Sequence, residues 1–369
     1  MITKQVKLDP HSPDQQVLRE AGEIIKNGGL VAFPTETVYG LGANGLDEEA
    51  AKKTYAAKGR PCDNPLIIHI ARWEDLSAIT KNLPEVAEVL GRHFWPGPFT
   101  MILEKSERVP HGTTGGLETV AVRMPENAIA RELIMAAGGY VSAPSANLSG
   151  KPSPTCGDHV MTDLYGSIEM VLDGGVVTIG IESTILDLTV TPPAILRPGK
   201  ITKGEIEEVI GSVVEITSEG SEGEGEQTDP KELKAPKVST GPKAPGTKYR
   251  HYAPDGVMQI VEGELFEEVA AISLFAREKV EAGYKVGIIA SAETAASYPQ
   301  GIVKNLGSRT DEETIARNLY RILREFNEEE VAYIYSESFP VEGYGGAIQN
   351  RLNKAAGQAR LMARDYLDL

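Results

Sequence analysis

Residues 30–42, LVAFPTETVYGLG, constrain the fold more than any other stretch of this chain. Their first four residues form an apolar run that is typical of a buried strand. Pro34 cannot donate a hydrogen bond to a strand ladder, so it ends or bends that strand. Thr35, Glu36 and Thr37 then place two hydroxyls and a carboxylate at the strand end, where α/β proteins tend to bind ligands. Taken alone, the stretch favours a simpler interpretation, namely a strand followed by an ordinary loop.

The composition limits what kind of protein this can be. The chain has 369 residues, enough for two domains or for one large one. Its 37 Lys and Arg against 53 Asp and Glu give a net charge of −16, and no large segment is basic overall, so we expect no tight binding to nucleic acid. We expect no membrane segment, because no apolar run approaches the roughly 20 residues needed, and the N-terminus lacks the apolar core of a signal peptide. Cys62 and Cys156 form no CxxC pattern, which favours a cytoplasmic protein.

The order of the sequence patterns predicts two α/β units. Residues 1–213 mix strand and helix patterns without strict alternation, which predicts a twisted mixed sheet with helices. Residues 214–255 are rich in Gly, Ser, Pro, Glu and Lys, which predicts a flexible linker that ends in KYRHYAP. Residues 256–369 carry four strand patterns with helices between them, which predicts a smaller, doubly wound (Rossmann-like) parallel α/β domain. Ser12 is expected to cap the first helix, with Pro13 at its first position.

Short motifs exclude several common active sites. The chain has no GxxxxGK[ST], GxSxG, HExxH or paired CxxC. It does contain GxGxxG, at Gly40, Gly42 and Gly45. A dinucleotide site needs these glycines directly after a strand and at the start of a helix. Here PTETVY stands between the apolar strand and the glycines, and the next helix is expected only after Asp47, so we interpret the match as chance.

Two pairs of polar residues are candidates for binding phosphate. Lys58 and Arg60 offer a point charge and a fork-shaped donor two residues apart. Taken alone, this pair favours a helix C-terminal charge followed by an exposed turn residue. Ser145 and Asn147 could bind phosphate oxygens, or water on Mg²⁺, without adding charge. The simpler interpretation of their segment, SAPSANLSG, is a solvated turn.

Other residues are candidates for binding an amino acid. Arg123 lies in the apolar strand TVAVRMP, and a buried arginine requires an anion. That anion is either a substrate carboxylate or an internal Asp or Glu, and the sequence favours neither. Thr35 and Ser183 could bind the polar groups of the same ligand. His69 lies inside a strand, where a histidine is more often a satisfied core residue than a ligand.

The motifs PTETVYGLG, AKGRPCDNPLIIHI, TVAVRMP, SAPSANLSGKPSPT, VLDGG, ESTI and LRPG, in this order, resemble the YrdC-like family. KYRHYAP and the α/β tail resemble the two-domain form of that family, and only the acidic part of the linker has no counterpart. The resemblance implies a nucleotidyltransferase that converts L-threonine, bicarbonate or CO₂, and ATP into threonylcarbamoyl-AMP and diphosphate. A partner transferase would then modify the adenosine beside the anticodon of certain tRNAs.

The resemblance also implies roles for individual residues. The catalytic residues would be Lys58, Arg60, Ser145 and Asn147. ATP would be bound by these four together with Thr119, Ser153, Arg197, Tyr249, His251 and Tyr252. L-threonine would be bound by Thr35, His69, Arg123, Ala143 and Ser183. The linker residues Tyr249, His251 and Tyr252 would form a lid that shields the labile product from water. Mg²⁺ is expected to enter with ATP, and no protein side chain is assigned to it.

Two other functions compete with this one. A non-catalytic RNA-binding module is the first, because short YrdC-like proteins are associated with RNA. The excess of acidic residues and the presence of a second domain count against it. A carbamoyl-transfer enzyme of hydrogenase maturation is the second. It should carry zinc-finger segments, and two cysteines are too few for those.

Overall fold

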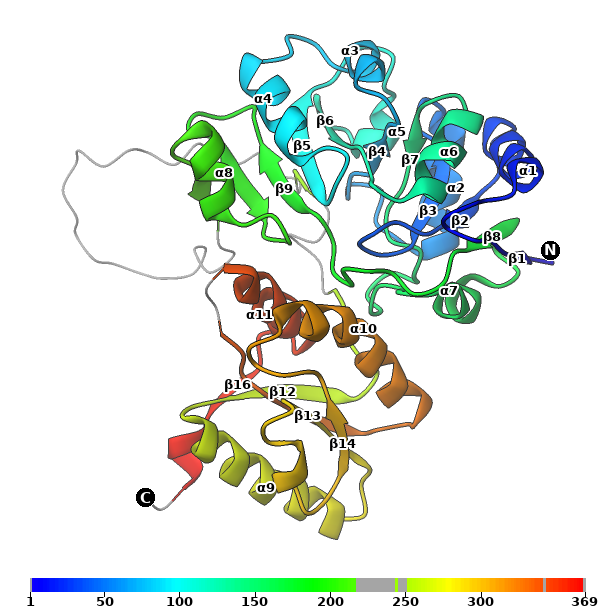
Figure 1. Cartoon of the computed structure of the whole chain (residues 1–369). Helices are drawn as coiled ribbons and strands as arrows, with labels where there is room; N and C mark the ends of the chain where they lie inside the picture. The colour runs from blue at the N-terminus through cyan, green and yellow to red at the C-terminus, as the bar shows by residue number, and fades with distance from the viewer. Residues whose placement is uncertain (1, 217–242, 245–250, 341–342, 368–369) are drawn as a thin grey trace.

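The computed structural model describes residues 2–216, 243–244, 251–340 and 343–367 (Figure 1). Tyr249, which the sequence predicts to be part of the lid, lies outside these ranges. Within them the chain forms two sheets, one of eleven strands and one of five. The predicted combination of a mixed sheet and a smaller parallel sheet is confirmed.

The first sheet has the strand order β1-β8-β2-β3-β7-β4-β6-β5-β9-β10-β11. It mixes parallel pairs, such as β4 with β6, and antiparallel pairs, such as β5 with β6. The strands are β1 (Lys4–Lys7), β2 (Val31–Phe33), β3 (Gly40–Asn44), β4 (Ile67–His69), β5 (Phe99–Glu104), β6 (Thr119–Arg123), β7 (Val141–Ser142), β8 (Met170–Asp173), β9 (Thr184–Asp187), β10 (Ala194–Arg197) and β11 (Val214–Glu215).

Helices cover this sheet, and apolar residues from both layers are buried between them. The helices are α1 (Gln15–Lys26), α2 (Glu48–Lys58), α3 (Leu76–Ile79), α4 (Glu85–Phe94), α5 (His111–Thr114), α6 (Ala128–Ala136), α7 (Gly157–Leu164) and α8 (Lys203–Ile210). The predicted cap of the first helix is wrong. Asp14, not Ser12, accepts hydrogen bonds from the backbone N–H groups of Gln16 and Val17, so α1 begins at Gln15.

The segment that contains LVAFPTETVYGLG, residues 30–42, folds into a hairpin. β2 and β3 pair antiparallel, with Val31 opposite Gly42 and Phe33 opposite Gly40. A Cβ at Gly42 would lie 2.9 Å from the Phe33 ring and 3.0 Å from the carbonyl oxygen of Val31. The first two glycines of the GxGxxG match therefore serve close strand packing, and the motif does not open a helix. Residues 34–39 are left as a tight polar turn between the two strands.

The second unit is a doubly wound parallel sheet with the order β14-β13-β15-β12-β16. The four strands that the sequence predicts are present, and β16 is a fifth that it did not predict. The strands are β12 (Val257–Glu262), β13 (Val286–Ala290), β14 (Ile302–Asn305), β15 (Tyr333–Glu337) and β16 (Arg360–Met362). The helices are α9 (Leu265–Glu281), α10 (Glu312–Glu328) and α11 (Gly343–Ala355).

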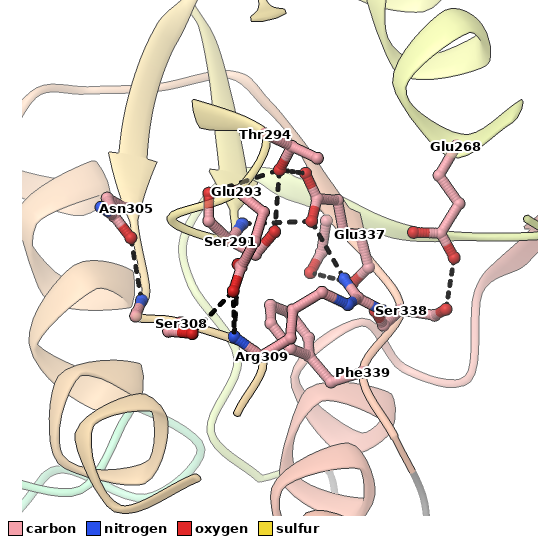
Figure 2. A network of polar contacts seen from close by, with 12 residues as sticks. Glu268, Ser291, Glu293, Thr294, Asn305, Ser308, Arg309, Glu337, Ser338 and Phe339 are labelled. Atoms are coloured by element: carbon pink, nitrogen blue, oxygen red, sulfur yellow. Dashed lines mark hydrogen bonds and ion pairs between the residues drawn. The ribbon is translucent and has the colours of Figure 1, made fainter. Parts of the chain in front are cut away.

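A polar network holds one end of this second sheet (Figure 2). Glu337, at the end of β15, accepts hydrogen bonds from the Tyr298 hydroxyl at 2.8 Å and from the Ser291 backbone N–H at 3.1 Å. Arg309 Nη1 lies 3.2 Å from the same carboxylate. Adjacent parallel strands of this kind commonly bind ligands at their carboxyl ends. Here Arg309 and Glu337 satisfy one another there, so the network acts as internal support.

The two units share a buried interface. Figure 1 shows α10 and α11 on the side of the second unit that faces the first. Val38 and Ile181 of the first unit belong to one apolar cluster with Leu319 and Tyr320 of α10. Gly180 has a positive φ of +93° and is packed so tightly that a Cβ there would lie 2.4 Å from the Arg317 Cα. Residues 180–182 are therefore fixed against α10.

This close approach predicts that Gly180→Ala destabilises the chain more than Gly175→Ala. Gly175 has a similar φ of +85°, but nothing lies within 4 Å of its Cβ position, so its substitution costs only the positive-φ strain of about 1 kcal/mol. Gly180→Ala carries the same strain and about 1–3 kcal/mol more from overpacking. Urea unfolding followed by fluorescence measures both, because the only tryptophans, Trp73 and Trp95, lie in the first unit. Equal losses of stability in the two variants would contradict the tight contact.

Candidate active site

A polar pocket lies where the polar turn after β2 meets the ends of β4, β6 and β7 and the segment around β9 and β10. Ten of the predicted site residues line it: Thr35, Arg60, His69, Arg123, Ala143, Ser145, Ser183, Arg197, His251 and Tyr252. Six residues that the sequence did not single out for a role complete the lining: Thr37, Val38, Gly40, Ile67, Pro144 and Glu182. The structure thus gathers most of the predicted residues in one cavity, although they are spread over more than 200 positions of the chain.

The turn after β2 is held by its own hydroxyls. Thr35 Oγ1 donates to the carbonyl oxygen of Val38 at 2.7 Å and lies 2.8 Å from Thr37 Oγ1. Thr37 Oγ1 in turn accepts a hydrogen bond from Arg123 Nη1 at 2.8 Å. These contacts tie the turn to β6 and fix both hydroxyls at the pocket wall.

Arg123 is buried and has an acidic partner. Its Nη2 lies 2.7 Å from Glu36 Oε1, and both side chains are 5% exposed. The sequence did not decide whether the anion at Arg123 is an internal acid or a substrate carboxylate. The structure shows that the internal ion pair is present. Arg123 also lines the pocket, so its guanidinium is part of the surface that a ligand would meet.

His69 lies in β4 with its ring in the pocket wall. Its Nδ1 is 3.2 Å from the carbonyl oxygen of Ile67. Burial and the nearby charge of Arg123 lower the pKa of His69 to about 3. The ring is therefore neutral at physiological pH, and it can exchange hydrogen bonds with a ligand without adding charge.

Lys58 lies behind the pocket and does not line it. Its Nζ donates to the backbone carbonyls of Ser145 and Asn147, from a site that is 2% exposed. Burial, and then the charge of Arg60, lower its pKa well below the ordinary value. In this structure Lys58 therefore holds the backbone of the loop that carries Ser145 and Asn147.

Within that loop, Ser145 Oγ donates to Asn147 Oδ1 at 2.6 Å. The Asn147 amide donates to the carbonyl oxygens of Leu148 and Lys151 at 2.7 and 2.9 Å. Of the pair, Ser145 lines the pocket and Asn147 stands behind it. Arg60 lines the pocket from the other side, where Asn64 and its neighbour Pro65 accept from it through their carbonyl oxygens.

The far wall of the pocket is built from β10 and the segment before β9. Arg197 donates from Nε to the Ser183 carbonyl at 3.0 Å and from Nη2 to Ser183 Oγ at 3.1 Å. Ser153 Oγ donates to Glu182 Oε1 at 2.6 Å and stands behind Glu182. Thr119, at the start of β6, does not line the pocket.

The described end of the linker closes one side of the pocket. His251 and Tyr252 both line it, and their rings lie 5.5 Å apart. Tyr252 has a positive φ of +64°, an uncommon conformation for a residue other than glycine. Its ring is buried and lies 5.1 Å from that of Tyr320 in α10. The second unit thus supports this part of the predicted lid.

The charge of the pocket suits an anion. Among the residues that the structure describes, Arg60, Arg123 and Arg197 line it, against one lining carboxylate, Glu182. Glu36 lies just behind and neutralises Arg123. Burial lowers the pKa of Arg60 to about 10, which leaves it charged at neutral pH. A net positive cavity with hydroxyl and backbone donors fits a polyphosphate or a carboxylate.

Comparisons with known proteins agree with this geometry. Residues 23–199 match a family model described as "Telomere recombination", and residues 201–357 match "Threonylcarbamoyl-AMP synthase, C-terminal domain". The Pyrococcus abyssi threonylcarbamoyl-AMP synthase is 48% identical over 340 residues, which cover 92% of this chain and 94% of that protein. The Bacillus subtilis threonylcarbamoyl-AMP synthase is 44% identical, with 95% of each chain covered.

The chain belongs to the threonylcarbamoyl-AMP synthase family. Among solved structures, P. abyssi Sua5 complexed with L-threonine superposes with a TM-score of 0.87 at 44% identity, over 98% of this chain and 99% of that one. Membership makes this chain an enzyme of the nucleotidyltransferase class and favours the catalytic interpretation over the RNA-binding one. No helix in the described part of the chain is long and apolar enough to cross a membrane.

Sequence reasoning missed the acidic residues of this site and their partners. Glu36 was noted as a carboxylate at a strand end, and Glu182 stood in the motif ESTI beside Ser183, but neither received a role. No residue of the second unit was given a role from sequence. Its Arg324 nevertheless pairs with Asp163 at 2.8 Å, and Asp163 accepts a hydrogen bond from the Leu148 N–H. A lone acidic residue among apolar or small neighbours is the signal that could have found Glu182.

The low pKa of His69 predicts how stability depends on pH. The unfolded chain binds a proton at His69 near pH 6.5, whereas the folded chain binds one only near pH 3. The contribution of His69 to stability is therefore complete above pH 6.5 and is lost as the pH falls towards 3, by about 1.4 kcal/mol for each pH unit. Urea unfolding at several pH values should give a shallower loss between pH 6 and 4 for His69→Gln than for the wild type. His11→Gln, at an exposed position, is the control. Parallel curves for wild type and His69→Gln would show that folding does not lower the pKa of His69.

Proposed function

We propose that this pocket joins L-threonine, bicarbonate or CO₂, and ATP to give threonylcarbamoyl-AMP and diphosphate. The observation that carries the proposal is that one continuous cavity is lined by all five predicted threonine residues and by five of the predicted ATP residues, namely Arg60, Ser145, Arg197, His251 and Tyr252. The family and the L-threonine complex of P. abyssi Sua5 support the same substrates.

L-threonine would occupy the end of the pocket beside the β2 turn. Arg123 would bind the carboxylate, since it is a buried cation at the wall. Neutral His69, together with Thr35 and Ser183, would form hydrogen bonds with the amine and the hydroxyl of L-threonine. Ala143 presents only a methyl group at this end, which leaves room for the side chain of the amino acid.

ATP would occupy the side of the pocket that carries Arg60 and Arg197. The two guanidinium groups would bind the triphosphate, and Ser145 would add a neutral donor. Lys58, Asn147 and Ser153 would support these groups from behind, as the hydrogen bonds above indicate. His251 and Tyr252 would cover the nucleotide together with Tyr249, while Thr119 would contribute only if it reaches the nucleotide from outside the cavity wall.

Mg²⁺ would enter with the triphosphate. Within the described ranges, no group of three or more His, Cys, Asp or Glu side chains is placed to hold a metal ion. The donor set near Ser145 and Asn147 consists of a hydroxyl and an amide, which fits a metal held mainly by phosphate oxygens and water. When bound, the ion would neutralise charge on the leaving diphosphate.

The proposed chemistry depends on positioning and charge. The threonine amine, held deprotonated, would add to CO₂. A carbon–nitrogen bond would form, one carbon–oxygen π bond would open onto oxygen, and the nitrogen would release one proton to water, which gives an N-carboxylate. A carboxylate oxygen would then attack the α-phosphorus, and the bond from that phosphorus to diphosphate would break. Arg60 and Arg197 would stabilise the charge that moves onto diphosphate. His69 and Arg123 would orient the amino acid for in-line attack.

The product is a mixed anhydride that water hydrolyses readily. It would pass to a partner transferase, which would place the threonylcarbamoyl group on the adenosine beside the tRNA anticodon. Since this chain is acidic overall, it would leave tRNA binding to that partner. The reaction would take place in the cytoplasm, where ATP and tRNA are present.

Diphosphate release tests the reaction directly. With ATP and Mg²⁺ present, release should require both L-threonine and bicarbonate, because the N-carboxylate is the nucleophile. The assay omits each component in turn and measures diphosphate with a coupled enzyme. Diphosphate release that does not require threonine, or no release from folded protein, would refute the proposal. Salt-dependent RNA binding without diphosphate release would support the RNA-binding module.

Arg60 tests the triphosphate assignment. Arg60→Gln should lower kcat/KM for ATP by about 100-fold, because a charged donor to the developing phosphate charge is lost. Arg72→Gln is the control, since Arg72 is exposed and pairs with Asp75 away from the pocket. Steady-state diphosphate release measures both variants. Unchanged kinetics in Arg60→Gln would remove Arg60 from the triphosphate site.

A further inference from the structure

The second domain reaches the wall of the pocket through one fully buried arginine. Arg351, in α11, is 0% exposed. Its Nε donates to Glu182 Oε2 at 3.2 Å, and its Nη1 donates to the carbonyl oxygen of Pro198 at 2.6 Å. Glu182 lines the pocket, and Pro198 directly follows Arg197, another lining residue. A side chain of the second domain thus contacts two segments of the catalytic pocket at once.

Glu182 connects this arginine to the predicted ATP residues. Its Oε1 accepts from Ser153 Oγ at 2.6 Å, and its Oε2 accepts from the Tyr320 hydroxyl of α10 at 2.9 Å. Burial alone would raise the pKa of the Glu182 carboxyl, but the charges of Arg351 and Arg197 outweigh burial and lower it to about 2. The carboxylate is therefore ionised, and each of its oxygens has a donor.

Without Arg351, the buried Glu182 carboxylate would lose its ion pair, and the charge of Arg197 would have to oppose the cost of burial without it. An ionised group in a low-dielectric site is strongly destabilised when its partner is removed. Glu182 would then repel a triphosphate bound at Arg197 and Arg60, or it would take up a proton and lose its bond from Ser153. Either change disturbs the nucleotide side of the pocket. On the threonine side, Ser183 follows Glu182 directly, but its hydroxyl is held by Arg197 and by Thr100. No hydrogen bond or ion pair joins Glu182 to Arg123 or Thr35 among the described residues.

We propose that Arg351 is a positioning residue for ATP, which acts through Glu182 by compensating its charge and fixing the wall that carries Ser153 and Arg197. Tyr320 assists, since it donates to the same oxygen and its ring lies against Tyr252. The role rests on the proposed ATP site. It gives the second domain an indirect part in nucleotide binding, because Glu182 lies in the first domain and Arg351 in the second.

The test is a double-mutant comparison in the full-length chain. Calorimetric titration of MgATP and of L-threonine should show that Arg351→Met weakens ATP binding about tenfold or more, while threonine affinity stays within about twofold. Adding Glu182→Gln removes the uncompensated charge, so Arg351→Met/Glu182→Gln should recover ATP binding to within about threefold of wild type. A merely structural role would lower both affinities together and would not be rescued.

Two further variants complete the experiment. Arg321→Met is the matched control, because Arg321 lies on α10 and pairs with Glu325 without contacting Glu182. If Arg351→Met does not fold, Tyr320→Phe keeps the ring against Tyr252 and removes one donor to Glu182, and it should weaken ATP binding by about two- to fivefold.

Unchanged ATP affinity in Arg351→Met, or a double variant no better than the single one, would overturn the proposal. If Arg351→Met does not fold, unchanged ATP affinity in Tyr320→Phe would overturn the proposal. These titrations need no turnover. A wild-type chain that binds ATP but releases no diphosphate would therefore refute the proposed reaction. The ATP titrations of the variants would still decide whether Arg351 positions the ATP site.

Discussion

The pairing of buried charges is the constraint on which the rest of this site depends. Desolvation of an ionised group costs several kcal/mol, so each buried charge must find a partner or give up its proton. The structure forms three such ion pairs: Arg123 with Glu36, Arg351 with Glu182, and Arg324 with Asp163. The hydrogen bonds of Lys58 described above go to carbonyl oxygens and not to a carboxylate. Burial and the charge of Arg60 lower its pKa. Each of these contacts joins segments that lie far apart in the chain, so satisfying the charges also assembles the pocket.

This arrangement explains how the site can act without a side chain in an obvious role as general base. The carbonyl oxygens of Asn64 and Pro65 hold the guanidinium of Arg60, and Ser183 holds that of Arg197, before any ligand arrives. In the proposed reaction, charge that moves onto the leaving diphosphate would meet donors whose orientation is already fixed, and little reorganisation would be needed. The second domain contributes to this preorganisation, since α10 and α11 pack against the segments that carry Glu182 and Tyr252.

Local patterns in the sequence predicted most of the elements, because strand and helix signals depend on neighbouring residues. Ordered motifs then predicted most of the pocket lining. Contacts between distant positions could not be predicted: Glu182 and Arg351 are 169 positions apart, and no local signal indicates their pairing. The same limit applies to Lys58, whose position in the last turn of a helix could not show that its side chain reaches the loop of Ser145. The Asp14 cap was missed for a different reason, since Ser12 and Asp14 are both good caps and only the backbone decides between them.

The ionisation of Glu182 tests the central claim most directly. If arginines from two domains outweigh burial, the carboxyl group stays charged down to a pKa of about 2. Carbon-13 NMR of the side-chain carboxyl, assigned by its loss in Glu182→Gln, can follow this group as the pH is lowered. We predict a constant chemical shift, that of a carboxylate, from pH 8 to pH 4. A titration with its midpoint above pH 4.5 would show that burial dominates, and it would contradict the charge pairing from which the pocket is derived.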